Sequence, residues 1–197
     1  MATIVVPFRS SDPKRRLDVG DDDRAAIAHG MLADVLAAAT PVGAVLVVAP
    51  TAPGLPHGVT LVDDPHRGQG AAVRAGLDAA ASLGLPAPFL VVNADLPCAG
   101  TRDLLALAGA VPDGGLALAA AVDGTTNALA LADERLFEPV YGPGSAGRFA
   151  ALADSRRLDA PNLIDDVDTL DDLLRLRERL GAQTGRVLAA LDLPSAA

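Results

Sequence analysis

The sequence predicts a single α/β domain of three layers, in which a mostly parallel β-sheet lies between two layers of helices. Short apolar runs rich in valine alternate with segments of helical periodicity along the whole chain. Such runs are typical of strands buried on both faces of a parallel sheet. The 197 residues suit one domain, and no linker, repeat or low-complexity block divides residues 1–197. The alternation therefore predicts βαβ units.

Each predicted element follows from a local pattern. Strands are expected where the short apolar runs lie, at residues 4–6, 44–48, 59–62, 89–92, 116–122 and 127–131. The first helix is expected to follow residues 21–23, three aspartates that are favourable at the positive end of a helix. Its apolar face comprises Ile27, Met31, Leu32, Val35 and Leu36. Further helices are expected at residues 71–83, 101–108, 146–153 and 169–180.

Composition and charge exclude several classes of function. The chain has 25 acidic and 16 basic side chains, and its net charge of −9 argues against nucleic acid or an anionic membrane as the main partner. No apolar run approaches the roughly 18 residues of a membrane span. The single cysteine, Cys98, suits a reducing compartment, so a cytoplasmic protein is expected. Hydrolase and zinc chemistry are disfavoured, because no nucleophile elbow or zinc-ligand spacing occurs.

A basic segment follows the first predicted strand. Ligands of open α/β sheets bind beyond the carboxyl ends of the strands, so such segments are informative. Residues 9–17 contain four basic residues and one aspartate, a net charge of +3 in an acidic chain. This concentration of positive charge suggests that the segment binds a polyanion such as a triphosphate. The alternative is a solvated loop that keeps the protein soluble.

Residues 68–70 open the helix expected at 71–83. The sequence Gly68-Gln69-Gly70 is small and flexible enough to approach a nucleotide base or ribose. Taken alone, this pattern is weak.

Acidic residues follow two other predicted strands or apolar stretches. Asp95 comes directly after the strand at 89–92, where a buried carboxylate needs a cation, a donor network or water. Mg²⁺ is usually held by one or two carboxylates and substrate phosphates, so Asp95 is a candidate ligand. The alternative is that Asp95 caps the turn before Pro97. Asp166 and Asp168 are spaced so that both side chains point to one side of an extended segment. They form either a metal site or a solvated acidic turn.

Two further patterns mark the starts of predicted helices. Thr169 and Asp172 have the spacing of a capping box at the start of the last long helix. Gly144 and Ser145 open the helix expected at 146–153, with Arg148 about one turn inside it. Such a helix terminus binds phosphate or carboxylate, although Ser145 is equally suited to be an N-cap.

Six motifs together resemble a known family. They are Pro7-Phe8-Arg9, Lys14-Arg15-Arg16-Leu17, Asn93-Ala94-Asp95-Leu96-Pro97, Gly124-Thr125-Thr126-Asn127, Tyr141-Gly142-Pro143-Gly144-Ser145 and Asp166-Val167-Asp168-Thr169. This set resembles the 2-phospho-L-lactate or phosphoenolpyruvate guanylyltransferases of coenzyme F420 biosynthesis, over about residues 4–180. The resemblance implies a glycosyltransferase-A-like fold, as in nucleotide-diphospho-sugar transferases, and a relation to the molybdenum-cofactor nucleotidyltransferases.

The resemblance also implies a reaction. A small phospho-acid would receive GMP from GTP with release of pyrophosphate, and the product would pass to a second transferase of the pathway. Arg9, Lys14 and Arg16 would hold the triphosphate, and Asp95, Asp166 and Asp168 would surround Mg²⁺. Lys14, Arg16 and Asp95 would be the catalytic residues. The acceptor pocket would comprise Thr126, Gly144, Ser145 and Arg148.

Two other functions remain open on the sequence. One is a molybdopterin guanylyl- or cytidylyltransferase, to which Gly68-Gln69-Gly70 is closer, although the Gly-rich first loop of that group is missing. The other is a nucleotide-binding regulator without catalysis, which the three acidic positions disfavour.

Overall fold

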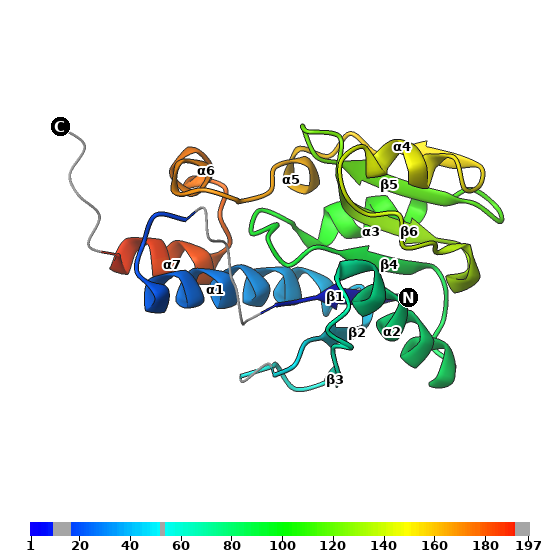
Figure 1. Ribbon diagram of the computed structural model, residues 1–197, viewed down its shortest axis with the longest axis horizontal. Helices are drawn as coiled ribbons and strands as arrows, with labels where there is room; N and C mark the ends of the chain where they lie inside the picture. The colour runs from blue at the N-terminus through cyan, green and yellow to red at the C-terminus, as the bar shows by residue number, and fades with distance from the viewer. Residues whose placement is uncertain (10–16, 52–53, 192–197) are drawn as a thin grey trace.

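Within the residues that the structure describes, seven strands form one sheet in the order β3-β2-β1-β4-β6-β5-β7, of which β1 to β6 are labelled in Figure 1. The computed structural model describes residues 1–9, 17–51 and 54–191. The strands are β1 (Ala2–Pro7), β2 (Gly43–Val48), β3 (Val59–Val62), β4 (Phe89–Val92), β5 (Leu116–Ala120), β6 (Thr126–Leu131) and β7 (Ser155–Arg157). Among these, β6 is antiparallel to both neighbours, and every other pairing is parallel. The prediction of a mostly parallel sheet is therefore confirmed.

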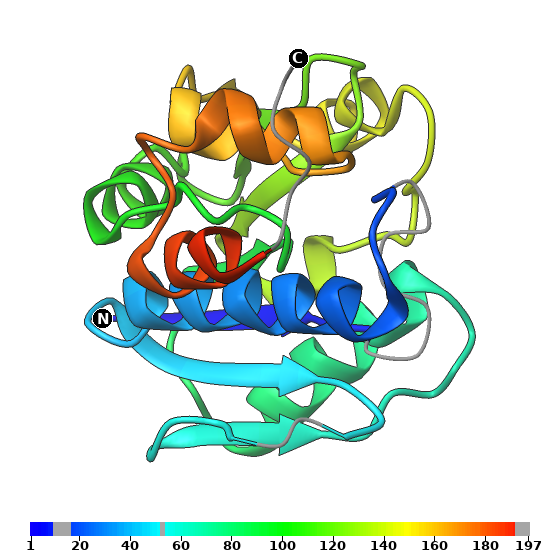
Figure 2. The same ribbon diagram turned by 90° about the vertical axis from the view of Figure 1, so that its left-hand side faces the viewer.

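Helices cover both faces of the sheet. They are α1 (Asp21–Ala39), α2 (Gln69–Ser82), α3 (Thr101–Gly109), the 3₁₀ turn η1 (Glu134–Leu136), α4 (Ser145–Ala150), α5 (Pro161–Ile164), α6 (Leu170–Leu176) and α7 (Ala182–Ala190). One face packs against α1, α3 and α5, and the other against α2, η1 and α4. The helix α7 lies alongside α1 (Figure 2). The three-layer prediction is confirmed, and no helix of the described residues is long and apolar enough to cross a membrane.

Alternation along β1 explains why its valines and isoleucine form a central strand. Ile4 and Val6 join the core beneath α1, whereas Val5 joins the core beneath α2. All three side chains are fully buried. The helix α2 approaches closely because Gly76 has no side chain, since a Cβ there would lie 2.4 Å from Cγ1 of Val5. The sheet is thus buried on both faces, as a parallel sheet requires.

The sequence predicts two strands in this region, at residues 116–122 and 127–131, and the end of the first is wrong. In the structure β5 ends at Ala120, because Gly124 adopts a φ of 82° and turns the chain back into β6. Asp123 supports this turn by accepting hydrogen bonds from the Thr125 N–H and hydroxyl. The resulting hairpin explains why β6 is antiparallel. It also brings the start of β6 beside the end of β4, where the Asn93 N–H donates to the Asn127 carbonyl at 3.0 Å.

A third apolar cluster lies outside the sheet, between α1, α6 and α7. Its buried members include Ile27, Met31, Val167 and Leu173. The N-terminus of α7 is held by the buried Asp34 of α1, whose carboxylate accepts from the backbone N–H groups of two α7 residues at 2.9 and 2.8 Å. This cluster matters for the site, because Val167 anchors the acidic segment between α5 and α6.

Candidate active site

A cavity of about 340 Å³ lies at the carboxyl ends of β1 and β4. This is the edge at which the sequence predicts a ligand site, because the strands that meet here are parallel and their carboxyl ends are adjacent. Several segments far apart in the chain contribute its walls. The lining residues are Pro7, Phe8, Arg9, Ala28, Met31, Asp64, Gln69, Ala72, Asn93, Ala94 and Asp95.

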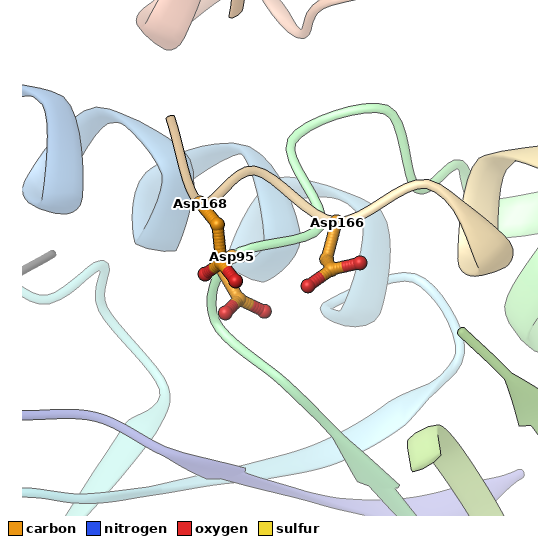
Figure 3. A group of neighbouring side chains, drawn as sticks. All are labelled: Asp95, Asp166 and Asp168. Carbon is orange, nitrogen blue, oxygen red and sulfur yellow. The ribbon is translucent and has the colours of Figure 1, made fainter. Parts of the chain in front are cut away.

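Three carboxylates converge at one side of this cavity. Asp95 follows β4, whereas Asp166 and Asp168 come from the segment between α5 and α6 (Figure 3). Each of the three residues offers one oxygen, and these oxygens lie within 4.8 Å of one another. All three residues are half-buried. The structure thus brings together the acidic residues that the sequence analysis singled out.

The path of the chain at Val167 explains this convergence. The Val167 side chain is fully buried in the cluster between α1, α6 and α7. Its N–H donates to the carbonyl of Asp95 at 3.1 Å, which joins the two acidic segments directly. Alternate side chains of an extended segment point to opposite sides. Burial of Val167 therefore turns Asp166 and Asp168 together toward Asp95.

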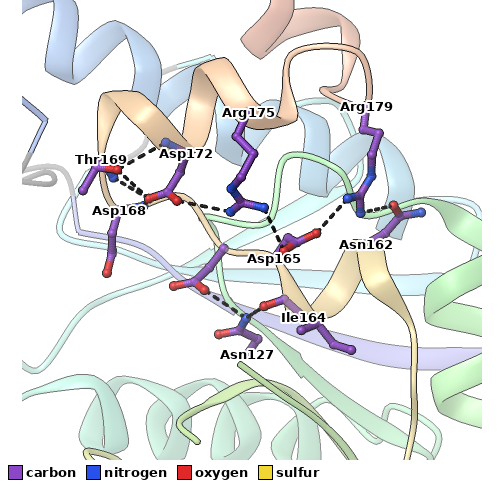
Figure 4. Close-up of polar contacts among 10 residues, drawn as sticks. Asn127, Asn162, Ile164, Asp165, Asp168, Thr169, Asp172, Arg175 and Arg179 are labelled. Carbon is purple, nitrogen blue, oxygen red and sulfur yellow. Dashed lines mark hydrogen bonds and ion pairs between the residues drawn. The ribbon is translucent and has the colours of Figure 1, made fainter. Parts of the chain in front are cut away.

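The remaining acidic residues of this segment have arginine or backbone partners. Asp165 accepts from Arg175 at 3.1 Å and from Arg179 at 2.7 Å (Figure 4). Asp172 accepts from the Thr169 N–H at 2.9 Å, and Thr169 in turn caps the N–H of Asp172. This geometry confirms the capping box predicted at the start of α6. The hydrogen bonds of Asp165 and Asp172 therefore hold the segment on one side, and Asp166 and Asp168 face Asp95 on the other side.

The electrostatics of the cluster fit a divalent cation. Burial raises the pKa of the Asp166 carboxyl, and the nearby charges of Asp95 and Asp168 raise it further. Burial also acts on Asp165, but there the hydrogen bonds from Arg179 and Arg175 outweigh it and lower the pKa. Three clustered carboxylates repel one another unless a cation offsets their charge. A set of hard oxygen ligands of this kind suits Mg²⁺.

The predicted nucleotide-binding residues are only partly described. Arg9 is exposed and lines the cavity. Gln69 also lines it, and its amide donates to Oδ1 of Asn93 at 2.8 Å. Gly68 has a φ of 94°, whereas a Cβ on Gly70 would lie 2.6 Å from Cβ of Pro139, so the absent side chain of Gly70 serves packing. Lys14 and Arg16 lie outside the described residues.

The predicted acceptor residues are largely satisfied within the protein. Thr126 and Ser145 are both buried, and their hydroxyl oxygens lie 3.1 Å apart. Gly144 has a φ of 72° and precedes α4. The Arg148 guanidinium donates to the backbone carbonyls of residues 140–143 at 2.7 to 3.3 Å. These bonds hold the loop in shape, and an acceptor role for the four residues stays a prediction.

The sequence analysis did not single out three residues at or near the cavity, of which Asp64 and Asn93 line it. Asp64 is buried against the cavity and accepts from the His66 N–H at 2.8 Å. Asn93 and Asn127 connect the ends of β4 and β6. Asp64 follows β3, so the rule that singled out Asp95 also applies to it. Asn93 and Asn127 belong to the quoted motifs, but only the folded hairpin shows that they meet.

The fold and site define a nucleotidyltransferase-like domain, and comparison with known proteins identifies the family. The family model described as the MobA-like NTP transferase domain matches residues 13–160. The chain belongs to this family. The match includes the cavity-lining residues after β3 and β4 and ends before the segment that contains Asp166 and Asp168.

Curated relatives cover most of the chain. A protein of Sphaerobacter thermophilus named phosphoenolpyruvate guanylyltransferase is 37% identical over 193 residues, covering 89% of this chain and 93% of its own. A 2-phospho-L-lactate guanylyltransferase of Halorubrum lacusprofundi is 34% identical over 183 residues, covering 88% and 82%. Both names describe guanylyl transfer, with different phospho-acids.

Solved structures support the fold. A putative nucleotide-diphospho-sugar transferase from Desulfovibrio desulfuricans matches with a TM-score of 0.74 at 18% identity, covering 95% of this chain and 94% of that one. At this identity the likeness concerns the fold alone. The predicted fold class is therefore confirmed.

Proposed function

We propose that this protein transfers GMP from GTP to the phosphate of a three-carbon phospho-acid, such as phosphoenolpyruvate or 2-phospho-L-lactate, and releases pyrophosphate. The observation that carries the proposal is the convergence of Asp95, Asp166 and Asp168 within 4.8 Å beside the cavity. Relatives of similar length are named guanylyltransferases for these two acids. The proposal includes Mg²⁺ dependence, a place in coenzyme F420 biosynthesis and a cytoplasmic location.

The proposed reaction needs no side chain that acts as a general base or as a nucleophile. A phosphate oxygen of the acceptor forms a bond to the α-phosphorus of GTP. The bond between this phosphorus and the oxygen that bridges it to the β-phosphate breaks, and this oxygen leaves with pyrophosphate. The attacking phosphate is already ionised at neutral pH, so alignment and charge neutralisation are the main requirements. Mg²⁺ would supply charge neutralisation and a template for the phosphates.

The chain would supply the rest of the site. Asp95, Asp166 and Asp168 would hold the metal, and Arg9, with Lys14 and Arg16, would bind the triphosphate. Gln69 and the backbone of Gly68 and Gly70 would lie beside the nucleoside. In this arrangement the acceptor would approach from the side of Thr126 and α4. The product is an activated anhydride, which a second transferase of the pathway would consume.

One assay tests the proposal. Purified protein is given Mg²⁺, GTP or CTP, and one of a panel of phospho-acids, and pyrophosphate release is measured. We expect release with GTP and a three-carbon phospho-acid, and none with EDTA. Turnover only with CTP or with molybdopterin would contradict the proposal and support a cofactor nucleotidyltransferase. Nucleotide binding without turnover on any acceptor would instead support a regulator.

A further inference from the structure

Asn127 occupies a central position beside the acidic cluster, although none of the roles assigned above uses its side chain. It is the second residue of β6 and only 2% exposed. Its side-chain amide donates to the carbonyl of Ile164 at 2.9 Å and lies 3.4 Å from Oδ1 of Asp166 (Figure 4). An amide nitrogen has two N–H donors, so both are directed at the segment that contains Asp166.

The backbone of Asn127 faces the other half of the cluster. Its carbonyl accepts from the Asn93 N–H at 3.0 Å, and Asn93 is two residues before Asp95. A single residue therefore bonds through its main chain to the end of β4 and through its side chain to the α5–α6 segment. The hairpin that was absent from the sequence prediction is what makes this connection, because it places the start of β6 between the two acidic segments.

The hydrogen bond from Asn127 can restrain a carboxylate of the acidic cluster. Three carboxylates within 4.8 Å repel one another, and an unrestrained carboxylate would rotate away. Metal sites commonly restrain their ligands by hydrogen bonds from neighbouring groups, and loss of such a group typically costs 10–100-fold in metal affinity. An amide is suited to this task, because it donates to a carboxylate and has no charge of its own to add.

We propose that Asn127 is a positioning residue of the metal centre, which sets the orientation of the Asp166 carboxylate relative to Asp95. This inference rests on the proposed function, since it assumes that the three carboxylates hold a divalent cation. It extends that proposal to a residue that is not one of the three candidate metal ligands. Its effect is on metal affinity, whereas a merely structural residue would affect stability alone.

The test measures the affinity of the full chain for Mn²⁺ in the absence of nucleotide. Electron paramagnetic resonance reports the binding directly. Asn127→Leu keeps a similar volume and removes both donors, and Asn127→Ser keeps a polar group that is too short to reach Asp166. We expect each variant to bind Mn²⁺ about 10–100-fold more weakly than the original chain. We also expect the Mg²⁺ concentration for half-maximal turnover to rise, with turnover recovering at high Mg²⁺.

Asn162→Leu is the matched control. Asn162 also anchors this part of the chain, through Asp103 at 3.0 Å and Arg179 at 2.8 Å, but it has no hydrogen bond to Asp166. Its replacement is expected to leave Mn²⁺ affinity unchanged. Equal affinity in a folded Asn127 variant and the original chain would overturn the inference, as would a loss of turnover that high Mg²⁺ does not restore. Absence of Mn²⁺ binding in the original chain would overturn the metal centre itself.

Discussion

Two polar clusters lie at the carboxyl edge of the sheet, and they are built in opposite ways. In the cluster of Asp95, Asp166 and Asp168, like charges are held within 4.8 Å of one another. In the cluster of Thr126, Ser145 and Arg148, the two hydroxyls pair with each other and the guanidinium bonds to carbonyls of its own loop. The first arrangement brings like charges together, whereas the second pairs donors with acceptors.

The two clusters differ in their effect on stability. Repulsion among these half-buried carboxylates lowers stability. The segment is held in place in spite of it by the buried side chain of Val167 and by the ion pairs of Asp165. The hydroxyl and arginine cluster has no such conflict. Substitutions in the acidic cluster should therefore change chemistry more than folding, and substitutions in the second cluster should do the reverse.

The largest effect is expected from Asp95→Asn. This change keeps the size of the side chain and removes the negative charge that lies closest to the end of β4. We expect turnover to fall by about 10²–10³-fold, comparable to the loss of one preorganised charge-stabilising group. The measurement is Mg²⁺-dependent pyrophosphate release, with circular dichroism to show that the fold is intact.

Asp78→Asn is the control for this change. Asp78 lies on α2 and pairs with Arg74 at 3.7 Å, with its side chain 64% exposed. Its replacement should leave turnover within about twofold, because exposed ion pairs contribute little. Near-normal turnover of Asp95→Asn would remove Asp95 from the proposed metal site.

Neighbouring aspartates offer a sharper test of the contrast. Asp166→Asn is expected to raise the Mg²⁺ concentration for half-maximal turnover by about 10–100-fold, because it removes a charged ligand. Asp165→Asn should leave that concentration unchanged and reduce stability by up to about 1 kcal/mol, since it breaks partly exposed ion pairs. Titration of turnover with Mg²⁺ and thermal unfolding measure the two quantities. Equal Mg²⁺ dependence in both variants would show that the two sides of the segment are not functionally distinct.

Much of the fold could be predicted because it depends on local patterns. Buried strands such as β1 and β4 are short valine-rich runs, and the capping box of Thr169 and Asp172 depends on a fixed spacing. Four elements were missed for physical reasons. The strand β7 has only three residues, two of them exposed arginines, and η1 and α5 are single turns. The helix α7 buries only Thr184 among its own residues.

The site was predictable in its acidic residues but not in its connections. The positions of Asp95 and Asp168 after apolar runs are visible in the sequence. The bond from Val167 to Asp95 and the role of Asn127 depend on contacts between distant segments, which no local pattern encodes. The pairing of Thr126 with Ser145 was hidden for the same reason. Small polar residues near the start of a helix can form hydrogen bonds to a ligand or to one another, and only the fold shows which of the two occurs.

The second cluster is tested by Ser145→Ala. The change leaves the buried Thr126 hydroxyl without its partner, and we expect a loss of about 1–3 kcal/mol in the free energy of unfolding. If the acceptor approaches from this side, its KM should rise several-fold while the KM for GTP is unchanged. Thr126→Val removes the other half of the pair and should give the same pattern. An equal rise in both KM values would mean that the cluster does not divide acceptor from nucleotide.

The smallest effect on activity is expected at Asp34, which lies on α1 and holds the N-terminus of α7. Asp34→Asn removes a negative charge from the N-terminus of α7 and replaces one of two acceptor oxygens by a donor that faces a backbone N–H. We expect a loss of about 1–2 kcal/mol in stability, since helix caps and favourable charges at helix termini contribute on this scale. Turnover and Mg²⁺ dependence should stay at their original values at temperatures below unfolding.

Asp22→Asn, at an exposed position in the first turn of α1, is the control and should lower the free energy of unfolding by only a few tenths of a kcal/mol. A fall in turnover without a fall in melting temperature would show that the docking of α7 also shapes the acidic cluster, through the apolar residues it shares with Val167.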